Sequence, residues 1–187
     1  VSGLKLFTVA HHEGKITPAD IATEAFGFGD EHRAQPAVVS ITQSSELGTV
    51  YTPPEIRAIA DYAHDNGMLL HMDGARLWNA AASLGLPFSA FTTDVGGDIV
   101  SLGGTKNGLM GAEAIVVINP DAVDGLIYLR KMSMQLSSKM RFVSAQLLAL
   151  FENNLGLSSA THANTMARKL RDALEERISS GAISGLR

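Results

Sequence analysis

Residues 68–76 read Met68-Leu69-Leu70-His71-Met72-Asp73-Gly74-Ala75-Arg76, an apolar run that turns abruptly into charge and glycine. A short apolar run that is followed by turn residues is typical of a buried strand. In open α/β sheets, ligands bind outside the carboxyl ends of the strands. The polar end of this strand therefore predicts a functional edge.

Similar runs recur along the chain and alternate with helix signals. Strands are predicted over residues 5–9, 37–41, 68–73, 98–102 and 114–118. Such alternation predicts the α/β class, here a three-layer, mostly parallel sheet with helices on both faces.

Local signals place the helix ends. A helix is predicted to open at Pro18, and another at Thr52-Pro53-Pro54-Glu55, which has the pattern of a capping box. Gly67 is expected to end this second helix, and Gly85 to end the next. Further helices are predicted to start at residues 119–121 and 137. Ser158 is expected to cap a last helix that reaches about residue 176.

Composition excludes several classes of protein. The chain has 187 residues, of which 45% are hydrophobic and 18% charged, an ordinary globular composition. Its 15 Lys and Arg against 19 Asp and Glu give a net charge of −4, so neither nucleic acid nor an anionic membrane is the expected partner. The absence of cysteine excludes disulfides, cysteine-ligated zinc and a thiolate nucleophile. With no apolar run of about 20 residues, the cytosol is the expected compartment.

Asp73 is the first candidate for chemistry. A carboxylate at the end of an apolar strand needs a partner, because an unpaired buried charge is costly. One interpretation is a structural ion pair with Arg76, and the other is a contact with a cationic ring nitrogen of a cofactor. His71 lies on the same sheet face, where it either orients Asp73 or is a core histidine bonded to the backbone.

Lys106 is the second candidate. It follows Gly103-Gly104-Thr105 and precedes Asn107-Gly108, a spacing that does not match a phosphate-binding P-loop. In isolation such a lysine is either solvated at the surface or held in an apolar, glycine-rich pocket, where desolvation frees the amine for a Schiff base. A lysine and a carboxylate at two strand ends are the groups that pyridoxal phosphate requires.

Several blocks together carry a resemblance to a known family. They are Gly48-Thr49-Val50-Tyr51-Thr52-Pro53, His71-Met72-Asp73-Gly74-Ala75-Arg76, Ser101-Leu102-Gly103-Gly104-Thr105-Lys106 and Met140-Arg141. The chain resembles the threonine aldolase and β-eliminating lyase family, which has an aspartate-aminotransferase-like fold and uses pyridoxal 5'-phosphate. The resemblance implies retro-aldol cleavage of threonine or allo-threonine to glycine and an aldehyde. It also implies a homo-oligomer, a dimer or tetramer with active sites at subunit interfaces.

The same resemblance assigns roles to individual residues. Lys106 would bond covalently to the cofactor, and Asp73 would face its pyridine nitrogen. Arg76 would lie near the phenolic oxygen or the substrate carboxylate, Thr105 would contact the phosphate, and His71 would support the ring site. Residues 1–155 would form part of a cofactor-binding domain, and residues 156–187 a helix leading to a truncated small domain.

Some family features are missing from this stretch of sequence. The chain starts without Met, and a new strand-like run begins at residue 182, so a fragment is expected. Residues 42–46 lack the histidine that many members carry there, so the catalytic base is expected elsewhere. His11 and His12 are candidate substitutes, but a polar loop is the simpler interpretation. Other β-eliminating lyases, racemases and a non-catalytic oligomerisation domain remain as alternatives.

Overall fold

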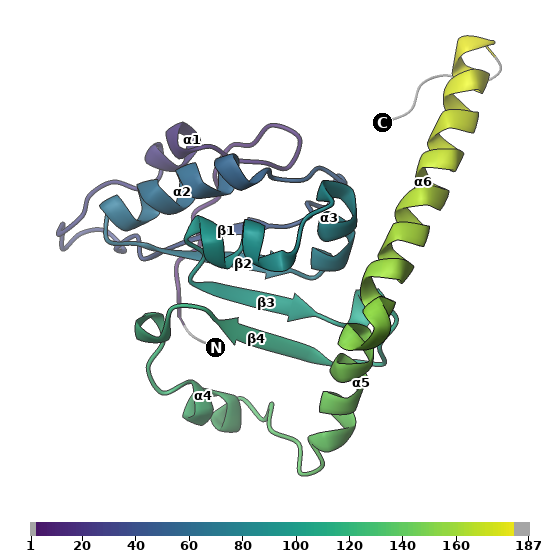
Figure 1. The fold of residues 1–187 in the computed structure, drawn as a ribbon. Helices are drawn as coiled ribbons and strands as arrows, with labels where there is room; N and C mark the ends of the chain where they lie inside the picture. Colours follow the sequence, from purple (N-terminus) through teal and green to yellow (C-terminus); the bar gives the residue numbers. More distant parts are fainter. Residues whose placement is uncertain (1–2, 182–187) are drawn as a thin grey trace.

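The computed structural model of this protein describes residues 3–181, and these form a four-stranded sheet with helices (Figure 1). The strands are β1 (Val38–Thr42), β2 (Leu69–Gly74), β3 (Ile99–Gly103) and β4 (Glu113–Val117), in that spatial order. The first three are parallel and β4 is antiparallel to β3. This arrangement confirms the α/β class and the mostly parallel sheet.

Six α-helices accompany the sheet over the described residues. They are α1 (Pro18–Ala22), α2 (Pro53–Asp65), α3 (Leu77–Leu84), α4 (Leu126–Met132), α5 (Arg141–Phe151) and α6 (Leu155–Ser179). The predicted capping signal holds at α2, where the Glu55 carboxylate accepts a hydrogen bond from the Thr52 amide at 2.7 Å. Gly67 and Gly85, just beyond α2 and α3, both have the left-handed backbone that favours glycine.

The core lies on one face of the sheet. Alternate strand residues point into it and pack against one side of α2: Val39, Ile41, Leu70, Met72, Val100 and Leu102 from the strands, and Ile56, Ile59, Ala60 and Ala63 from the helix. Burial of each large aliphatic side chain contributes about 1.5–3 kcal/mol, so this face holds the strands in register.

The opposite face of the sheet is polar near its middle and largely open. Val38 and Ile115 lie on it and are 54% and 57% exposed. Over residues 3–181 this second face is therefore only partly covered. The same face carries His71 and Asp73 of β2, both half-buried.

Three predicted elements differ from the structure. Residues 5–9 are not a strand, because no neighbouring strand in the described part of the chain pairs with them. Residues 119–121 lead only into a 3₁₀ turn, Pro120–Ala122, and α4 follows after Gly125. Ser158 is not a cap: α6 begins at Leu155, and the Ser158 hydroxyl donates to the Leu155 carbonyl. The run predicted from residue 182 lies outside the described residues.

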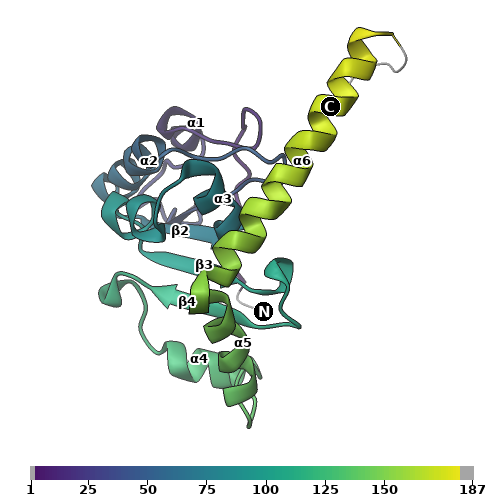
Figure 2. The same ribbon diagram turned by 45° about the vertical axis from the view of Figure 1, so that its right-hand side comes forward.

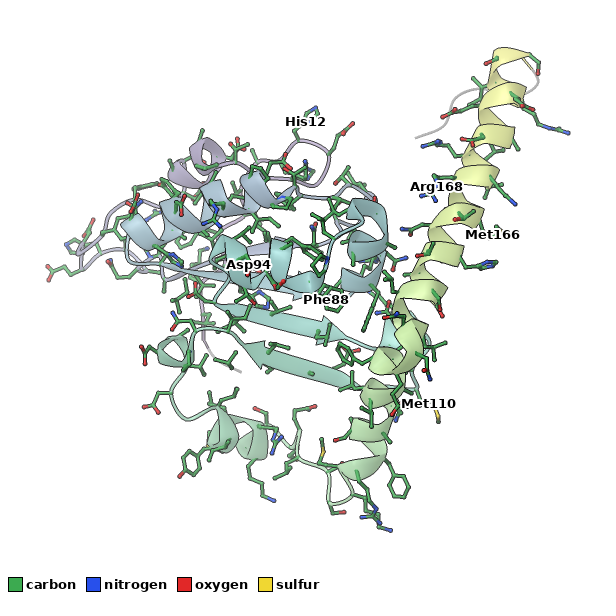
Figure 3. All side chains as sticks on the ribbon, viewed as in Figure 1. His12, Phe88, Asp94, Met110, Met166 and Arg168 are labelled. Atoms are coloured by element: carbon green, nitrogen blue, oxygen red, sulfur yellow. The ribbon has the colours of Figure 1, made fainter. Side chains whose placement is uncertain are left out.

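Helix α6 packs across α3 and then extends beyond the rest of the molecule (Figure 2). Met166 and Arg168 lie on this extended part (Figure 3). The contact centres on Trp78, whose ring lies 4.6 Å from that of Phe88 and 5.0 Å from that of Phe151, centroid to centroid. Helix α6 approaches this ring closely at Gly156, where an added Cβ would lie 2.8 Å from Trp78 Cε3. The glycine is therefore required by packing.

We expect Gly156→Ala to destabilise the protein by about 1–3 kcal/mol, because the new methyl group overpacks the Trp78 ring. This loss outweighs the gain of about 1 kcal/mol in helix propensity. Urea unfolding of the full-length protein measures the change. Ser159→Ala, at an exposed position of the same helix, is the control and should not lower the midpoint. A higher midpoint for Gly156→Ala would contradict the packing argument.

Asp98 anchors the amino end of β3. Its side chain is nearly fully buried and accepts hydrogen bonds from the Leu70 amide at 2.7 Å, His64 Nε2 at 2.9 Å and Asn119 Nδ2 at 2.8 Å. Burial raises the pKa of Asp98, but these bonds outweigh burial and hold the pKa below its ordinary value of 3.8. The carboxylate thus joins α2, β2 and the segment after β4.

Because the folded-state pKa of Asp98 is lowered, its contribution to stability is complete above about pH 4 and is lost as the pH falls through the lowered pKa. We expect Asp98→Asn to lower the free energy of unfolding by about 1–3 kcal/mol at neutral pH, since buried donors lose a carboxylate acceptor. The difference from the wild type should shrink in acid. Urea unfolding across pH tests this, with the exposed Asp121→Asn as control. If the difference in free energy of unfolding between the two proteins stayed constant down to the lowest pH, ionisation of Asp98 would not contribute to stability.

Candidate functional site

The carboxyl ends of β2 and β3 meet at one edge of the sheet (Figure 1). Gly103 lies so close to the loop after β2 that an added Cβ would be 2.7 Å from Ala75 Cα. The Asn107 side chain donates to the carbonyl of Gly103 at 2.7 Å and to that of Ala75 at 3.3 Å. The loop after Asp73 and the turn that carries Lys106 are therefore held against each other, as the parallel pattern predicts.

Asp73 forms a turn with its own backbone. Its Oδ1 accepts from the Ala75 amide at 2.9 Å. Within residues 3–181, Oδ2 makes no hydrogen bond, and no ion pair joins Asp73 to Arg76. The structural ion pair considered from the sequence is therefore wrong, and one oxygen of this carboxylate is available to a ligand.

Arg76 instead pairs with Glu46, a residue of the loop that follows β1. Its two terminal nitrogens donate to the two carboxylate oxygens at 2.9 and 2.8 Å. The hydrogen bonds and charge of Arg76 lower the pKa of Glu46, and the charge of Lys106 adds a smaller effect in the same direction. The sequence interpretation missed Glu46, although an acid after one parallel strand and an arginine after the next could have indicated it.

Lys106 lies in the 3₁₀ turn Thr105–Asn107 and is exposed. Over the described residues its ammonium group makes no hydrogen bond or ion pair. The apolar pocket expected around it is not formed by this part of the chain. The side chain is therefore free to meet a ligand at the edge where Asp73 also lies.

Thr105 has its donors occupied. Both its amide and its hydroxyl donate to Glu113 Oε1, at 3.1 and 2.5 Å. Glu113 begins β4, so this contact ties the lysine turn to the antiparallel edge strand. A phosphate could bind Thr105 only in place of the Glu113 carboxylate.

His71 links three strands and does not contact Asp73 directly. Its Nδ1 bonds with the Ser40 hydroxyl at 2.8 Å, and its Nε2 with the Ser101 hydroxyl at 2.9 Å. Burial lowers the pKa of His71, and the nearby charge of Asp73 opposes this effect. The histidine is thus held by side-chain hydroxyls of β1 and β3 rather than by the backbone or Asp73.

The two histidines near the amino end belong to a polar loop. His11 Nδ1 accepts from the Gly14 amide at 3.1 Å, and His12 forms a bridge with Lys15. Figure 3 shows His12 at the outer tip of this loop, pointing away from the molecule. This geometry favours the simpler interpretation made from the sequence.

Two cavities lie away from the edge that carries Lys106. One of about 390 Å³ lies between the amino-terminal segment and β1, and includes Leu6, Phe7 and Val38 in its lining. The other, of about 250 Å³, includes Phe88, Val100 and Phe151 in its lining. Neither lining includes Asp73, Arg76 or Lys106.

Comparisons with known proteins identify the family of this chain. Residues 1–179 match the family model described as beta-eliminating lyase. The chain belongs to this family.

Similar proteins extend the comparison. The low specificity L-threonine aldolase of Pseudomonas sp. (strain NCIMB 10558) is 43% identical over 90% of this chain and 49% of its own length. The chain thus spans about half the length of that relative. A structure of Leishmania major threonine aldolase matches 93% of this chain and 51% of its own, with a TM-score of 0.87 and 31% identity. The PLP-bound C-S lyase from Staphylococcus hominis shares the fold, at 18% identity and a TM-score of 0.58 over 91% of this chain and 43% of its own.

We expect replacement of Asp73 by Asn to lower the pKa of His71 further, because the opposing negative charge is lost. NMR titration of the His71 ring protons in the cofactor-free, full-length protein measures this pKa in both proteins. Asp172→Asn, a substitution on α6, is the control and should leave it unchanged. A rise in the His71 pKa on Asp73→Asn would contradict the proposed charge interaction.

Proposed function

We propose that the full-length protein is a pyridoxal-phosphate-dependent lyase that cleaves threonine or allo-threonine to glycine and acetaldehyde. The observation that carries this proposal is that the loop after Asp73 and the turn that carries Lys106 lie against each other, while over residues 3–181 the Lys106 amine and Oδ2 of Asp73 have no hydrogen-bond partner. The similarity to low specificity L-threonine aldolase supports the choice of substrate. The similarity to the structure of Leishmania major threonine aldolase supports the same choice.

The residues present fit this cofactor. It requires an amine that can bond to its aldehyde carbon and an anion at its ring nitrogen, and Lys106 and Asp73 provide these at one edge. When bound, pyridoxal phosphate supplies an electron sink for breaking a bond at the substrate's α-carbon. Donors for its phosphate are not free at Thr105, so we expect other residues of the full-length protein to bind it.

The chain's own residues would act as follows. The Asp73 carboxylate would hold a proton on the ring nitrogen, since an adjacent negative charge favours the protonated form of a base. Lys106 would provide the nucleophile, the nitrogen that bonds to the aldehyde carbon of the cofactor after losing its proton. The Arg76 guanidinium would bind the phenolic oxygen or the substrate carboxylate. His71, fixed between two serines, would support β2 beneath Asp73.

A homo-oligomer, dimer or tetramer, is part of the proposal. Large apolar side chains are exposed together on α4 and α5, among them Ile127, Tyr128, Met132 and Phe142. Exposed apolar clusters of this kind mark protein contacts. None of the helices in the described part of the chain is long and apolar enough to cross a bilayer. The cytosolic location stays a prediction.

Other reactions on the same cofactor are separated by their products. Retro-aldol cleavage yields glycine and an aldehyde. β-Elimination yields a keto acid and ammonia, and racemisation yields the inverted amino acid. A non-catalytic oligomerisation domain would yield none of them. Product analysis with threonine as substrate therefore decides among the four alternatives.

We expect Lys106→Ala to abolish the covalent attachment of the cofactor. After borohydride treatment of the full-length protein, mass spectrometry should find the cofactor on the peptide that contains Lys106, and not in the variant. Cleavage of threonine should be lost as well, because the nucleophile that bonds to the cofactor is removed. The matched control is Lys169→Ala, an exposed lysine of α6. Attachment of the cofactor to another lysine would disprove the assignment.

A further inference from the structure

The ion pair between Glu46 and Arg76 joins two loops at the candidate site. Both carboxylate oxygens of Glu46 accept from the terminal nitrogens of Arg76. Arginine uses this two-bond geometry to bind free carboxylates as well. The edge of the guanidinium formed by its two terminal nitrogens is therefore filled by the protein's own acid.

The two partners differ in their exposure to water. The Glu46 side chain is 72% exposed, whereas that of Arg76 is 27% exposed. An exposed carboxylate remains solvated when it leaves its partner, so ion pairs at the surface are weak. Another carboxylate can therefore replace Glu46 on Arg76 at a small cost.

The loop that carries Glu46 is fixed by bonds on both sides of it. The Ser45 hydroxyl accepts from the amides of Leu47 and Thr49, at 3.3 and 3.2 Å. The buried side chain of Gln43 bonds to the backbone of Tyr51 at 2.9 and 3.0 Å. Release of Arg76 therefore needs only a rotation of the Glu46 side chain, and the loop can stay in place.

Two cations act on the Glu46 carboxylate, at an edge that also carries the carboxylates of Asp73 and Glu113. Arg76 and Lys106 are both cationic, and both act on the Glu46 carboxylate. Glu46 thus cancels one of the two positive charges that an incoming carboxylate would meet. Replacing the Glu46 carboxylate by a neutral side chain therefore makes this edge more positive, and we expect the backbone of the loop to stay in place.

We propose that Glu46 is a placeholder for a substrate carboxylate: it holds Arg76 in the free protein and is displaced when an amino acid binds. The identity of the ligand as an amino acid rests on the function proposed above. Glu46 is then a positioning residue that acts through Arg76 and sets how tightly a carboxylate binds.

The first experiment needs no cofactor. Phenylglyoxal reacts with free guanidinium groups, and peptide mass spectrometry follows its addition to Arg76 in the full-length protein. We expect Glu46→Gln to raise the rate about two- to five-fold, the range that corresponds to a weak surface ion pair. Sodium acetate, at constant ionic strength, should protect Arg76 at a lower concentration in the variant. The control is Asp172→Asn, which breaks the Arg171–Asp172 pair on α6 and should change neither value.

The second experiment uses the full-length protein loaded with cofactor. We expect Glu46→Gln to lower KM for threonine about two- to five-fold while kcat stays within about two-fold, because only competition for Arg76 is removed. Glu46→Ala, which also removes the hydrogen bonds that Gln can retain, should lower KM at least as much. A loss of loop structure would instead lower kcat.

The outcomes separate the two proposals. An unchanged or slower reaction of Arg76 with phenylglyoxal, or a raised KM for threonine in both variants, overturns the placeholder role. Faster labelling and stronger acetate protection in a protein that cleaves no threonine support competition for Arg76 and overturn the proposed lyase function.

Discussion

Parallel pairing of β2 with β3 is the constraint on which the candidate site depends. Asp73 lies opposite Ser101, and Gly74 opposite Leu102, so the two strands end at the same level. Strand residues alternate between faces, so a slip of one residue would turn Asp73 into the apolar core. Gly74 permits the close pairing, because an added Cβ would lie 2.8 Å from the Ser101 carbonyl oxygen.

One face of the sheet stabilises the fold, and the other carries the polar groups of the candidate site. The face that packs on α2 is apolar and is buried by residues of the described chain itself. The other face is lined by Ser40, His71 and Ser101, which satisfy one another's hydrogen bonds across three strands. Such a chain of polar groups tolerates partial burial and keeps β1, β2 and β3 aligned beneath Asp73. The open edge can therefore carry charged groups without weakening the core.

Local signals in the sequence were sufficient for much of the fold. The capping residues of α2, the glycines after α2 and α3, and the β-branched runs of β1 and β4 act within a few residues, and their elements were predicted correctly. Residues 5–9 have an equally apolar pattern, but a strand also needs a partner, which sequence alternation cannot supply. The partners of the charged side chains were harder to predict from the sequence. Arg76 is three residues from Asp73, yet Asp73 folds back onto the Ala75 amide and Arg76 reaches Glu46, thirty positions away.

Two carboxylates, one from the loop after β1 and one from the start of β4, explain which groups of the edge remain without an internal partner. Glu46 satisfies Arg76, and Glu113 satisfies Thr105, so two of the five residues assigned to the site already hold an internal anion. In the described chain, Lys106 and one oxygen of Asp73 are left without such a partner. A carboxylate can stand in for a phosphate or a substrate acid, because all of them are oxygen anions. No amino-acid side chain carries an aldehyde carbon, the group that Lys106 would meet, and within residues 3–181 no cation occupies Oδ2 of Asp73, which would meet the ring nitrogen.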